Sequence, residues 1–150
     1  MERRKFLGFG IFAAAAAFIP ANLSAEDYRK TKPDAWTAHT VEDAIAKLYG
    51  TNKTIEQGVT LTAPDVAANG GAVPVDFSSE IAAKSVAVFQ NANPESAVCV
   101  FTLNENSVID YSIKMKMKQS GTITIVVEGR DGKLYSAKKA INVALGGCEG

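Results

Sequence analysis

The sequence predicts an all-β protein, an immunoglobulin-like antiparallel sandwich with one short N-terminal helix and a flexible C-terminal arm. Three observations predict this fold. Beyond residue 54 apolar residues recur at a period of two, which is typical of strands with one buried face. Turn signals rich in Gly, Asn and Pro separate about seven such stretches. The length of 150 residues allows one domain with a hydrophobic core.

The N-terminal 25 residues have the organisation of an export signal. A basic start, Arg3-Arg4-Lys5, precedes an apolar stretch over residues 6–19, and small residues follow up to Ala25. A membrane anchor is the alternative, but that stretch is shorter than the roughly 20 residues that a spanning helix needs. We expect residues 1–25 to be removed as a signal peptide, which takes away three basic residues and one acid.

The paired arginines, followed by Phe6 and Leu7, resemble the twin-arginine export signal, although Glu2 and Gly8 replace its usual Ser or Thr and its later Lys. This resemblance predicts export of the folded protein to the periplasm. The mature chain keeps 13 basic and 15 acidic residues of the original 16 of each, so nothing indicates nucleic-acid binding. We expect no membrane attachment after signal removal.

Residues 26–39 are polar and lack apolar periodicity, so we expect a flexible segment that ends at the only histidine, His39. A short amphipathic helix follows, because Thr40 is a suitable N-cap, Gly50 is a stop signal and apolar residues recur between them at helical spacing. The sandwich domain is expected over residues 40–145.

The first strands are predicted around three apolar pairs: Val59 and Leu61, Val73 and Val75, and Val86 and Val88. Pro74 lies within the second stretch and favours an edge strand, because proline has no N–H to donate to a ladder.

The clearest alternation runs from Ser107 to Lys118, with apolar residues on one face and Lys114, Lys116 and Lys118 on the other. We interpret the lysines as a solvated face that discourages edge pairing, with a docking role as the alternative. Residues 123–127 and 134–143 predict the last two strands, joined at an Asp131-Gly132 turn.

Catalytic and metal chemistry is not predicted. A triad needs a histidine held beside its nucleophile, and His39 lies in a polar segment outside the expected core. One histidine and two distant cysteines do not have the ligand spacing of zinc, haem or iron–sulfur sites. We therefore expect no catalytic residues, no metal site and no cofactor.

The two cysteines have different surroundings. Cys99 alternates with Phe101 and Leu103, so we expect a small buried hydrophobe, with a disulfide to Cys148 as the alternative. Cys148 instead has only glycines and a glutamate around it, in the tail Gly146-Gly147-Cys148-Glu149-Gly150.

The tail predicts a thin, pliable arm, because Gly146 and Gly147 remove side-chain bulk. From Val143 to Cys148 the arm can reach about 17 Å at roughly 3.4 Å per residue. Glu149 and the terminal carboxylate disfavour the thiolate, so any chemistry at Cys148 must come from a partner. A frayed terminus or an intermolecular disulfide is the alternative.

The mature region resembles the SoxY family, the carrier subunit of the bacterial periplasmic Sox thiosulfate-oxidation system. Five segments, in this order, carry the resemblance: RRKFL at 3–7, VEDAIAKLYG at 41–50, NGGAVPV at 69–75, NANPE at 91–95 and GGCEG at 146–150.

The resemblance implies a non-enzymatic carrier in a heterodimer with a SoxZ-like subunit. Thiosulfate intermediates would be held as a thiosulfonate or persulfide on Cys148, at the tip of the arm formed by residues 146–150. A c-type cytochrome would load the thiol, a hydrolase would release sulfate, and a sulfane dehydrogenase would oxidise the remaining sulfur.

Two further expectations concern the contacts of this carrier. The family tail usually reads Gly-Gly-Cys-Gly-Gly, so Glu149 is a departure that should crowd a narrow channel and repel an anion. Val98 and Val100 are candidates for the partner surface, since exposed apolar patches often mark interfaces. The alternative function is an exported immunoglobulin-like binding or assembly module whose tail cysteine forms an intermolecular disulfide.

Overall fold

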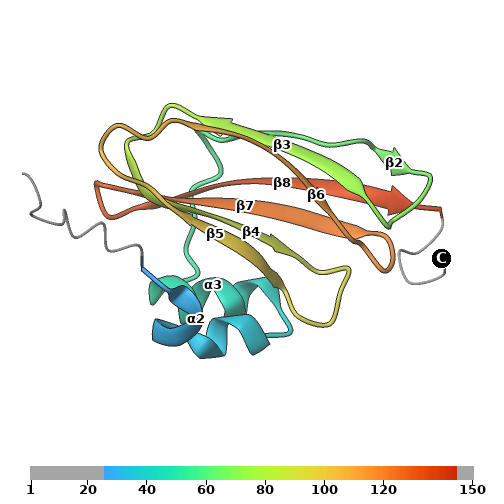
Figure 1. Cartoon of the computed structure of the whole chain (residues 1–150), viewed down its shortest axis with the longest axis horizontal. Coiled ribbons are helices and arrows are strands. Elements are labelled where there is room, and N and C mark those ends of the chain that lie inside the picture. The colour runs from blue at the N-terminus through green and yellow to red at the C-terminus, as the bar shows by residue number, and fades with distance from the viewer. Residues whose placement is uncertain (1–25, 145–150) are drawn as a thin grey trace, which may run out of the picture.

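Two β-sheets and a layer of helices make up residues 26–144, which the computed structural model describes (Figure 1). A three-stranded sheet in the order β1-β3-β6 faces a five-stranded sheet in the order β2-β8-β7-β4-β5. The predicted immunoglobulin-like sandwich is confirmed. The elements are α2 (Tyr28–Thr31), η1 (Pro33–Thr37), α3 (Val41–Tyr49), β1 (Thr60–Thr62), β2 (Val66–Ala67), β3 (Val73–Ser79), β4 (Ala83–Gln90), β5 (Ala97–Thr102), β6 (Ile109–Met115), β7 (Gly121–Gly129) and β8 (Leu134–Val143).

The core has two parts because the five-stranded sheet is covered on both faces. Val86 and Val88 of β4 pack between the two sheets, whereas Ala87 and Phe89 of the same strand pack under the helices. All four side chains are fully buried. This two-sided burial explains why β4 is almost continuously apolar.

The predicted helix is confirmed as α3. Thr40 caps it, because its hydroxyl accepts a hydrogen bond from the Asp43 N–H at 3.2 Å. Gly50 ends it in a left-handed conformation with φ 79°, which glycine adopts without steric cost.

The expectation of a flexible segment over residues 26–39 is corrected by the structure, which folds this stretch into the short helices α2 and η1. Asp27 caps α2 and Pro33 begins η1. Ala35 and Ala38 are each 1 % exposed and pack with α3 against the five-stranded sheet. Alanine gives a weak periodicity signal, which is why the polar sequence around these two residues concealed the packing.

The prediction that Pro74 lies on an edge strand is wrong for the strand as a whole, since β3 is the central strand of its sheet. The reason is the shortness of β1, which pairs only with residues 76–78 of β3. Pro74 pairs with Lys114 of β6 and lies beyond the end of β1. One side of β3 is therefore unpaired at the proline.

The predicted alternation in residues 107–118 is confirmed in β6, where Ile109 and Met115 are buried and Lys114 is exposed. Met117 continues the buried face beyond the strand. The pairing of β2 with β8 is parallel, and two-residue strands of this kind leave no periodic signal in the sequence.

Candidate functional site at the end of the last strand

The residues predicted to carry sulfur lie beyond the structure. Cys148 and the arm residues Gly146, Gly147, Glu149 and Gly150 are outside the described residues, which end at Ala144. What the structure provides is the base of the arm and the surface around it.

The base of the arm is held on both sides of β8. On one side the Asn142 N–H donates to the Asp65 carbonyl at 2.9 Å, and the Ala144 N–H donates to the Ala67 carbonyl at 3.0 Å. On the other side the Val143 N–H donates to the Ser120 hydroxyl at 2.8 Å. The backbone is therefore fixed up to Ala144, four residues before Cys148.

Two connections lie toward the same end of the five-stranded sheet as the end of β8 (Figure 1), the β4–β5 loop (residues 91–96) and the β6–β7 turn (residues 116–120). Asn93 joins them, because its Nδ2 donates to the Lys116 carbonyl and its Oδ1 accepts from the Lys118 N–H, both at 2.8 Å. One half-buried side chain thus fixes the loop to the turn that carries two of the predicted lysines.

Gln90 fixes the β4–β5 loop from inside. It is 1 % exposed, its Nε2 donates to the Glu95 carbonyl at 2.7 Å, and its Oε1 accepts from the Asn93 N–H at 2.7 Å. A buried amide with all these partners specifies one loop conformation.

Gly121, at the start of β7, allows the loop to approach closely. A Cβ at this position would lie 2.7 Å from the Asn91 Oδ1 and 2.9 Å from the Ala92 Cβ. The Asn91 Oδ1 also accepts a hydrogen bond from the Thr122 N–H at 2.7 Å. Glycine is therefore required here by contact distance.

These three framework residues, Gln90, Asn93 and Gly121, were not identified from the sequence. The segment NANPE at 91–95 takes part in the family resemblance, which does not indicate what its side chains contact. Their hydrogen-bond partners are up to 25 residues away in the chain, as in the bond between Asn93 and the Lys118 N–H.

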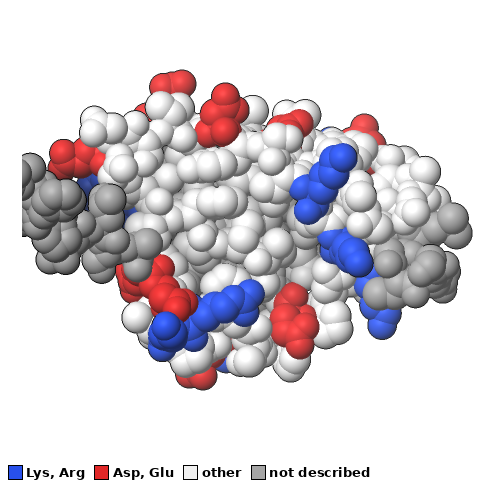
Figure 2. All heavy atoms as spheres, in the orientation of Figure 1, with Lys and Arg blue, Asp and Glu red and all other residues white. Residues whose placement is uncertain are grey.

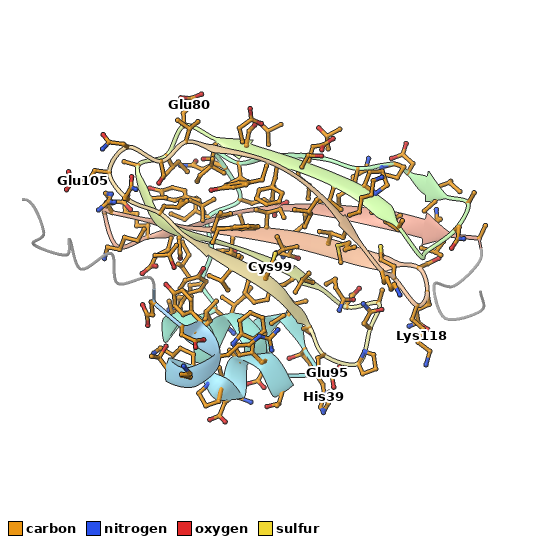
Figure 3. The ribbon with its side chains drawn as sticks, in the orientation of Figure 1. His39, Glu80, Glu95, Cys99, Glu105 and Lys118 are labelled. Carbon is orange, nitrogen blue, oxygen red and sulfur yellow. The ribbon has the colours of Figure 1, made fainter. Side chains whose placement is uncertain are left out.

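His39 lies at the same end of the molecule (Figure 3). Its Nδ1 is 2.9 Å from the Pro94 carbonyl oxygen, so the ring nitrogen is the donor and the carbonyl accepts. His39 is exposed and lies outside the core, as expected, and the neighbouring Ala38 carbonyl accepts a backbone hydrogen bond from the Ser96 N–H at 2.9 Å.

Lysines are prominent around the base of the arm. The predicted stripe of Lys114, Lys116 and Lys118 is exposed, and Lys or Arg side chains gather toward the β8 end of the face in Figure 2. Lys139 forms an ion pair with Asp65. The hydrogen bond from Lys139, and next its positive charge, lower the pKa of the Asp65 carboxyl. This surface can attract an anion.

Cys99 lies on the edge strand β5 and is half-buried against the core between the sheets. Burial raises the pKa of its thiol to about 11, which disfavours the reactive thiolate. The prediction of an apolar role holds, with less burial than expected because β5 is an edge strand of the sheet that the described residues form.

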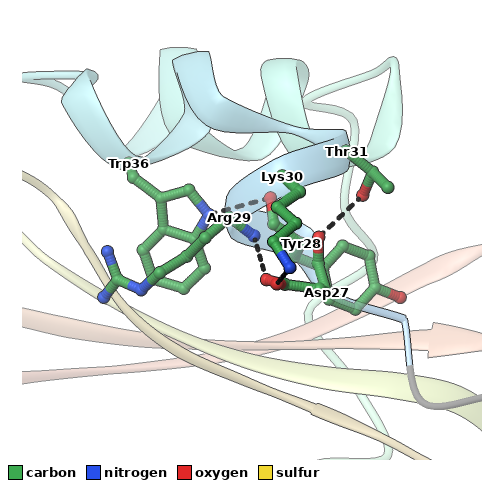
Figure 4. A network of polar contacts seen from close by, with 6 residues as sticks. All are labelled: Asp27, Tyr28, Arg29, Lys30, Thr31 and Trp36. Carbon is green, nitrogen blue, oxygen red and sulfur yellow. Dashed lines mark hydrogen bonds and ion pairs between the residues drawn. The ribbon is translucent and has the colours of Figure 1, made fainter.

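The surface beside Cys99 belongs to the N-terminal helices. The Arg29 guanidinium lies 4.2 Å from the Trp36 ring centroid, and the Trp36 indole N–H donates to the Tyr28 carbonyl at 3.2 Å (Figure 4). The expected outward position of Val98 and Val100 is corrected, since both valines are half-buried and Val100 packs with the helices. Their role as a partner surface stays a prediction.

Within residues 26–144, the side-chain cluster that a metal site needs and the helix that a membrane span needs are both absent. No group of three or more His, Cys, Asp or Glu side chains in this part of the chain is arranged to hold a metal ion. Within the same residues, no helix is long and apolar enough to cross a membrane.

The sequence and the fold of this chain are similar to those of known proteins. A family model described as sulfur oxidation protein SoxY matches residues 45–148. The solved sulfur carrier protein SoxY from Chlorobium limicola f thiosulfatophilum is 30% identical, with a TM-score of 0.64 over 73% of this chain and 96% of that chain. A superoxide reductase (neelaredoxin) from Ignicoccus hospitalis is 16% identical, with a TM-score of 0.52 over 58% and 80%, and shares the fold alone. Curated protein sequences give no match.

Proposed function

Because the chain belongs to the SoxY family of sulfur oxidation proteins, we propose that it carries the sulfur intermediates of thiosulfate oxidation as covalent adducts of Cys148. The observation that supports this proposal most directly is the fixed base of the arm. Hydrogen bonds hold the chain at Ala144, and Cys148 follows after Leu145 and the pair Gly146-Gly147.

The length of this arm suits delivery to another protein. Four residues from Ala144 to Cys148 span up to about 14 Å at roughly 3.4 Å per residue. Gly146 and Gly147 add no side-chain bulk, so a narrow active-site channel can admit the arm. The sandwich supplies a rigid mount and the arm supplies reach.

The loading step requires an external oxidant. The Cys148 thiolate sulfur joins the sulfane sulfur of thiosulfate in a new S–S bond, the product is a thiosulfonate, and two electrons leave with the c-type cytochrome of the system. Hydrolysis of that adduct then releases sulfate and a proton and leaves a persulfide, which the sulfane dehydrogenase oxidises further. These reactions belong to the partner enzymes, so the chain is a carrier and not a catalyst.

The local chemistry agrees with that division of labour. Glu149, which follows Cys148 in the sequence, disfavours a thiolate at that cysteine. The imidazole of His39 is committed through its Nδ1 to the Pro94 carbonyl. A thiol without its own base depends on the enzymes that it visits.

We also propose the setting that the family implies. Residues 1–25 direct export to the periplasm by the twin-arginine route, and the mature protein pairs with a SoxZ-like subunit. The domain boundaries expected from the sequence, with the sandwich over 40–145 and the arm over 146–150, are part of this proposal.

The deciding experiment is the intact mass of the mature protein after export in a thiosulfate-oxidising host, before and after a reductant. We expect a reductant-labile sulfur adduct on the Cys148 peptide, its loss in Cys148→Ser, and its retention in the matched variant Cys99→Ser. A free thiol, or only a protein–protein disulfide, in the presence of thiosulfate and the partner enzymes would instead support the binding or assembly module.

A further inference from the structure

We propose that a cavity at the N-terminus of α3 binds a free tetrahedral oxyanion of the sulfate or phosphate class. The cavity has a volume of about 410 Å³ and lies between the first turn of α3 and the strands β7 and β8. This site uses neither Cys148 nor the arm, so it is independent of the proposed carrier function. The lining consists of His39, Thr40, Val41, Glu42, Asn91, Thr122, Thr124 and Lys138.

The sheet becomes polar where the helix begins. α3 lies on the face of the five-stranded sheet that is turned away from the three-stranded sheet (Figure 1). Val126 of β7 is fully buried on this face. Because alternate residues of a strand share a face, Thr124 and Thr122 continue the same row toward the start of α3. Hydroxyl groups therefore replace apolar side chains at this point.

Thr124 is the residue that points to a ligand. It is only 3% exposed, and its hydroxyl makes no hydrogen bond within residues 26–144. The Ser96 Oγ is the only fully enclosed side-chain polar atom without a partner in that part of the chain. The Thr124 hydroxyl is therefore not enclosed, and it opens on the cavity that Thr124 lines. Buried hydroxyl groups usually have a partner, which a ligand in the cavity would supply.

The start of α3 supplies backbone donors. The Thr40 hydroxyl accepts from the Asp43 N–H at 3.2 Å, and the Ala44 N–H makes the first intrahelical bond, to the Thr40 carbonyl at 3.0 Å. The N–H groups of Val41 and Glu42 make no hydrogen bond among the described residues, and both residues line the cavity. Free N–H groups at the positive end of a helix dipole favour an anion.

Lys138 adds a positive charge from the sheet. It is the cross-strand partner of Thr124 in the ladder of β7 and β8, so the two side chains lie on the same face. None of the three ion pairs within residues 26–144 involves Lys138, whereas the neighbouring Lys139 is paired with Asp65. The ammonium and the Thr124 hydroxyl can therefore reach the same ligand.

The loop side of the cavity is fixed in advance. The Asn91 Oδ1 accepts from the Thr122 N–H at 2.7 Å, which leaves the Asn91 Nδ2 as a further donor. The His39 Nδ1 donates to the Pro94 carbonyl at 2.9 Å, and Figure 3 shows His39 beside Glu95 of the same loop. A ligand therefore meets a wall that needs no rearrangement to bind it.

Glu42 provides the sharpest test of the sign of the ligand's charge. It is exposed and is the only carboxylate in the lining. We assign an anion because the two free N–H groups and the Lys138 ammonium can only donate hydrogen bonds. Glu42 weakens the binding of an anion and would strengthen that of a cation. Removal of its charge thus changes the affinity in opposite directions for the two kinds of ion.

The test titrates sodium sulfate into the mature protein with Cys148→Ser, so that no chemistry at the arm contributes. Sodium chloride at equal ionic strength is the control. We expect the backbone amide NMR signals of Val41 and Glu42 to shift and saturate with sulfate and to stay in place with chloride. Separate titrations with phosphate and thiosulfate identify which tetrahedral anion binds most tightly.

Four variants measure the contribution of each group. Thr124→Val should weaken sulfate binding at least about tenfold, because it removes a hydrogen bond to a charged ligand, whereas Thr124→Ser should retain binding. Lys138→Gln should weaken binding about two- to five-fold, the range given by one exposed ionic contact. Glu42→Gln should tighten binding by a similar factor. The matched control Lys133→Gln, in the exposed β7–β8 turn outside the cavity, should leave the affinity unchanged.

Thermal unfolding gives a second readout. Without sulfate, Thr124→Val should be as stable as the parent, because no hydrogen bond within the described residues is lost. Sulfate should raise the unfolding midpoint of the parent more than that of Thr124→Val, since a ligand stabilises only the folded state that binds it. The general stabilising effect of the salt acts on both proteins and cancels in this comparison.

Shifts that do not saturate, equal shifts with chloride, or equal affinities of the parent and Thr124→Val would overturn the proposal. Weaker sulfate binding in Glu42→Gln would overturn the assignment of an anion. None of these results bears on the carrier function, because the tested protein lacks the Cys148 thiol.

Discussion

Replacement of Gly121 by alanine tests whether close packing of the β4–β5 loop holds the end of the sandwich together. The new Cβ would lie 2.7 Å from the Asn91 Oδ1 and 2.9 Å from the Ala92 Cβ. The third contact, at 3.1 Å, is the backbone nitrogen of Ala92. Two of these atoms belong to short, fixed groups, so the loop itself must shift.

The expected cost has two parts. Overpacking of a filled site costs about 1–3 kcal/mol. Displacement of the Asn91 Oδ1 also breaks its 2.7 Å hydrogen bond with the Thr122 N–H, and such a bond contributes about 0.5–1.5 kcal/mol. We therefore expect Gly121→Ala to lower the free energy of unfolding by roughly 2–4 kcal/mol. At about 3 °C per kcal/mol, the unfolding midpoint should fall by about 6–12 °C.

Urea and thermal unfolding of the mature protein measure this change, with Gly71→Ala as the matched control. Gly71 lies in the β2–β3 loop, and a Cβ there would meet only the side chain of Asn69, at 3.1 Å. That control should lose less than about 1 kcal/mol. Equal stability of the two variants would refute the claim that the loop is held by its close approach to β7.

Three further predictions concern charge and thiol chemistry. The ion pair with Lys139 keeps the folded-state pKa of Asp65 below its ordinary value of 3.8, so its stabilisation is present above about pH 4 and is lost as the pH falls through the lower folded pKa. Thermal midpoints of Asp65→Asn and the parent should therefore differ at pH 7 in low salt, and should converge in concentrated salt or as the pH falls through the lowered folded pKa. A persistent difference would contradict this assignment. Cys99, with a pKa of about 11, should react with iodoacetamide at pH 8 about 200-fold more slowly than an ordinary cysteine with a pKa near 8.5. Its reaction rate should rise tenfold per pH unit. Mass spectrometry of the labelled peptide measures this rate, and a rate near that of a free cysteine would disprove the prediction. Glu149→Gly should speed enzymatic loading of Cys148, because it removes bulk and a repelling charge, and an unchanged or slower rate would rule out crowding.

The sequence predicts correctly those helices and strands whose signals lie within one short segment. The helix α3 could be predicted because the cap at Thr40, the stop at Gly50 and the apolar positions between them all lie within one short segment. The face of β6 could be predicted because one side meets the core and the other meets water. The N-terminal helices could not, since their buried contacts are made by two alanines against a distant sheet.

The candidate site likewise has one part that the local sequence predicts and one part that depends on contacts between distant residues. Cys148 and its glycines are predicted from an unusual tail, which is a local feature, and they stay a prediction. The framework around the base of the arm depends on pairs such as Asn93 with Lys118, which are 25 residues apart. Nothing in the spacing of Asn, Gln and Lys residues indicates which of them meet until the strands are paired. The order of the strands, and hence the central position of the strand that contains Pro74, could not be predicted for the same reason, because it depends on pairing between distant segments.

The pairing of β8 on both of its sides has a mechanical consequence. In the proposed carrier function a partner enzyme would hold the tip of the arm, and a pull along the strand would reach the ladders of β8 with β7 and with β2 at the same time. These ladders run alongside the strand, so the pull loads them in shear and several bonds must break together. An edge strand pulled sideways would instead open one bond after another. The mount is thus built to withstand tension, and repeated capture and release of the tip can proceed while the sandwich stays folded.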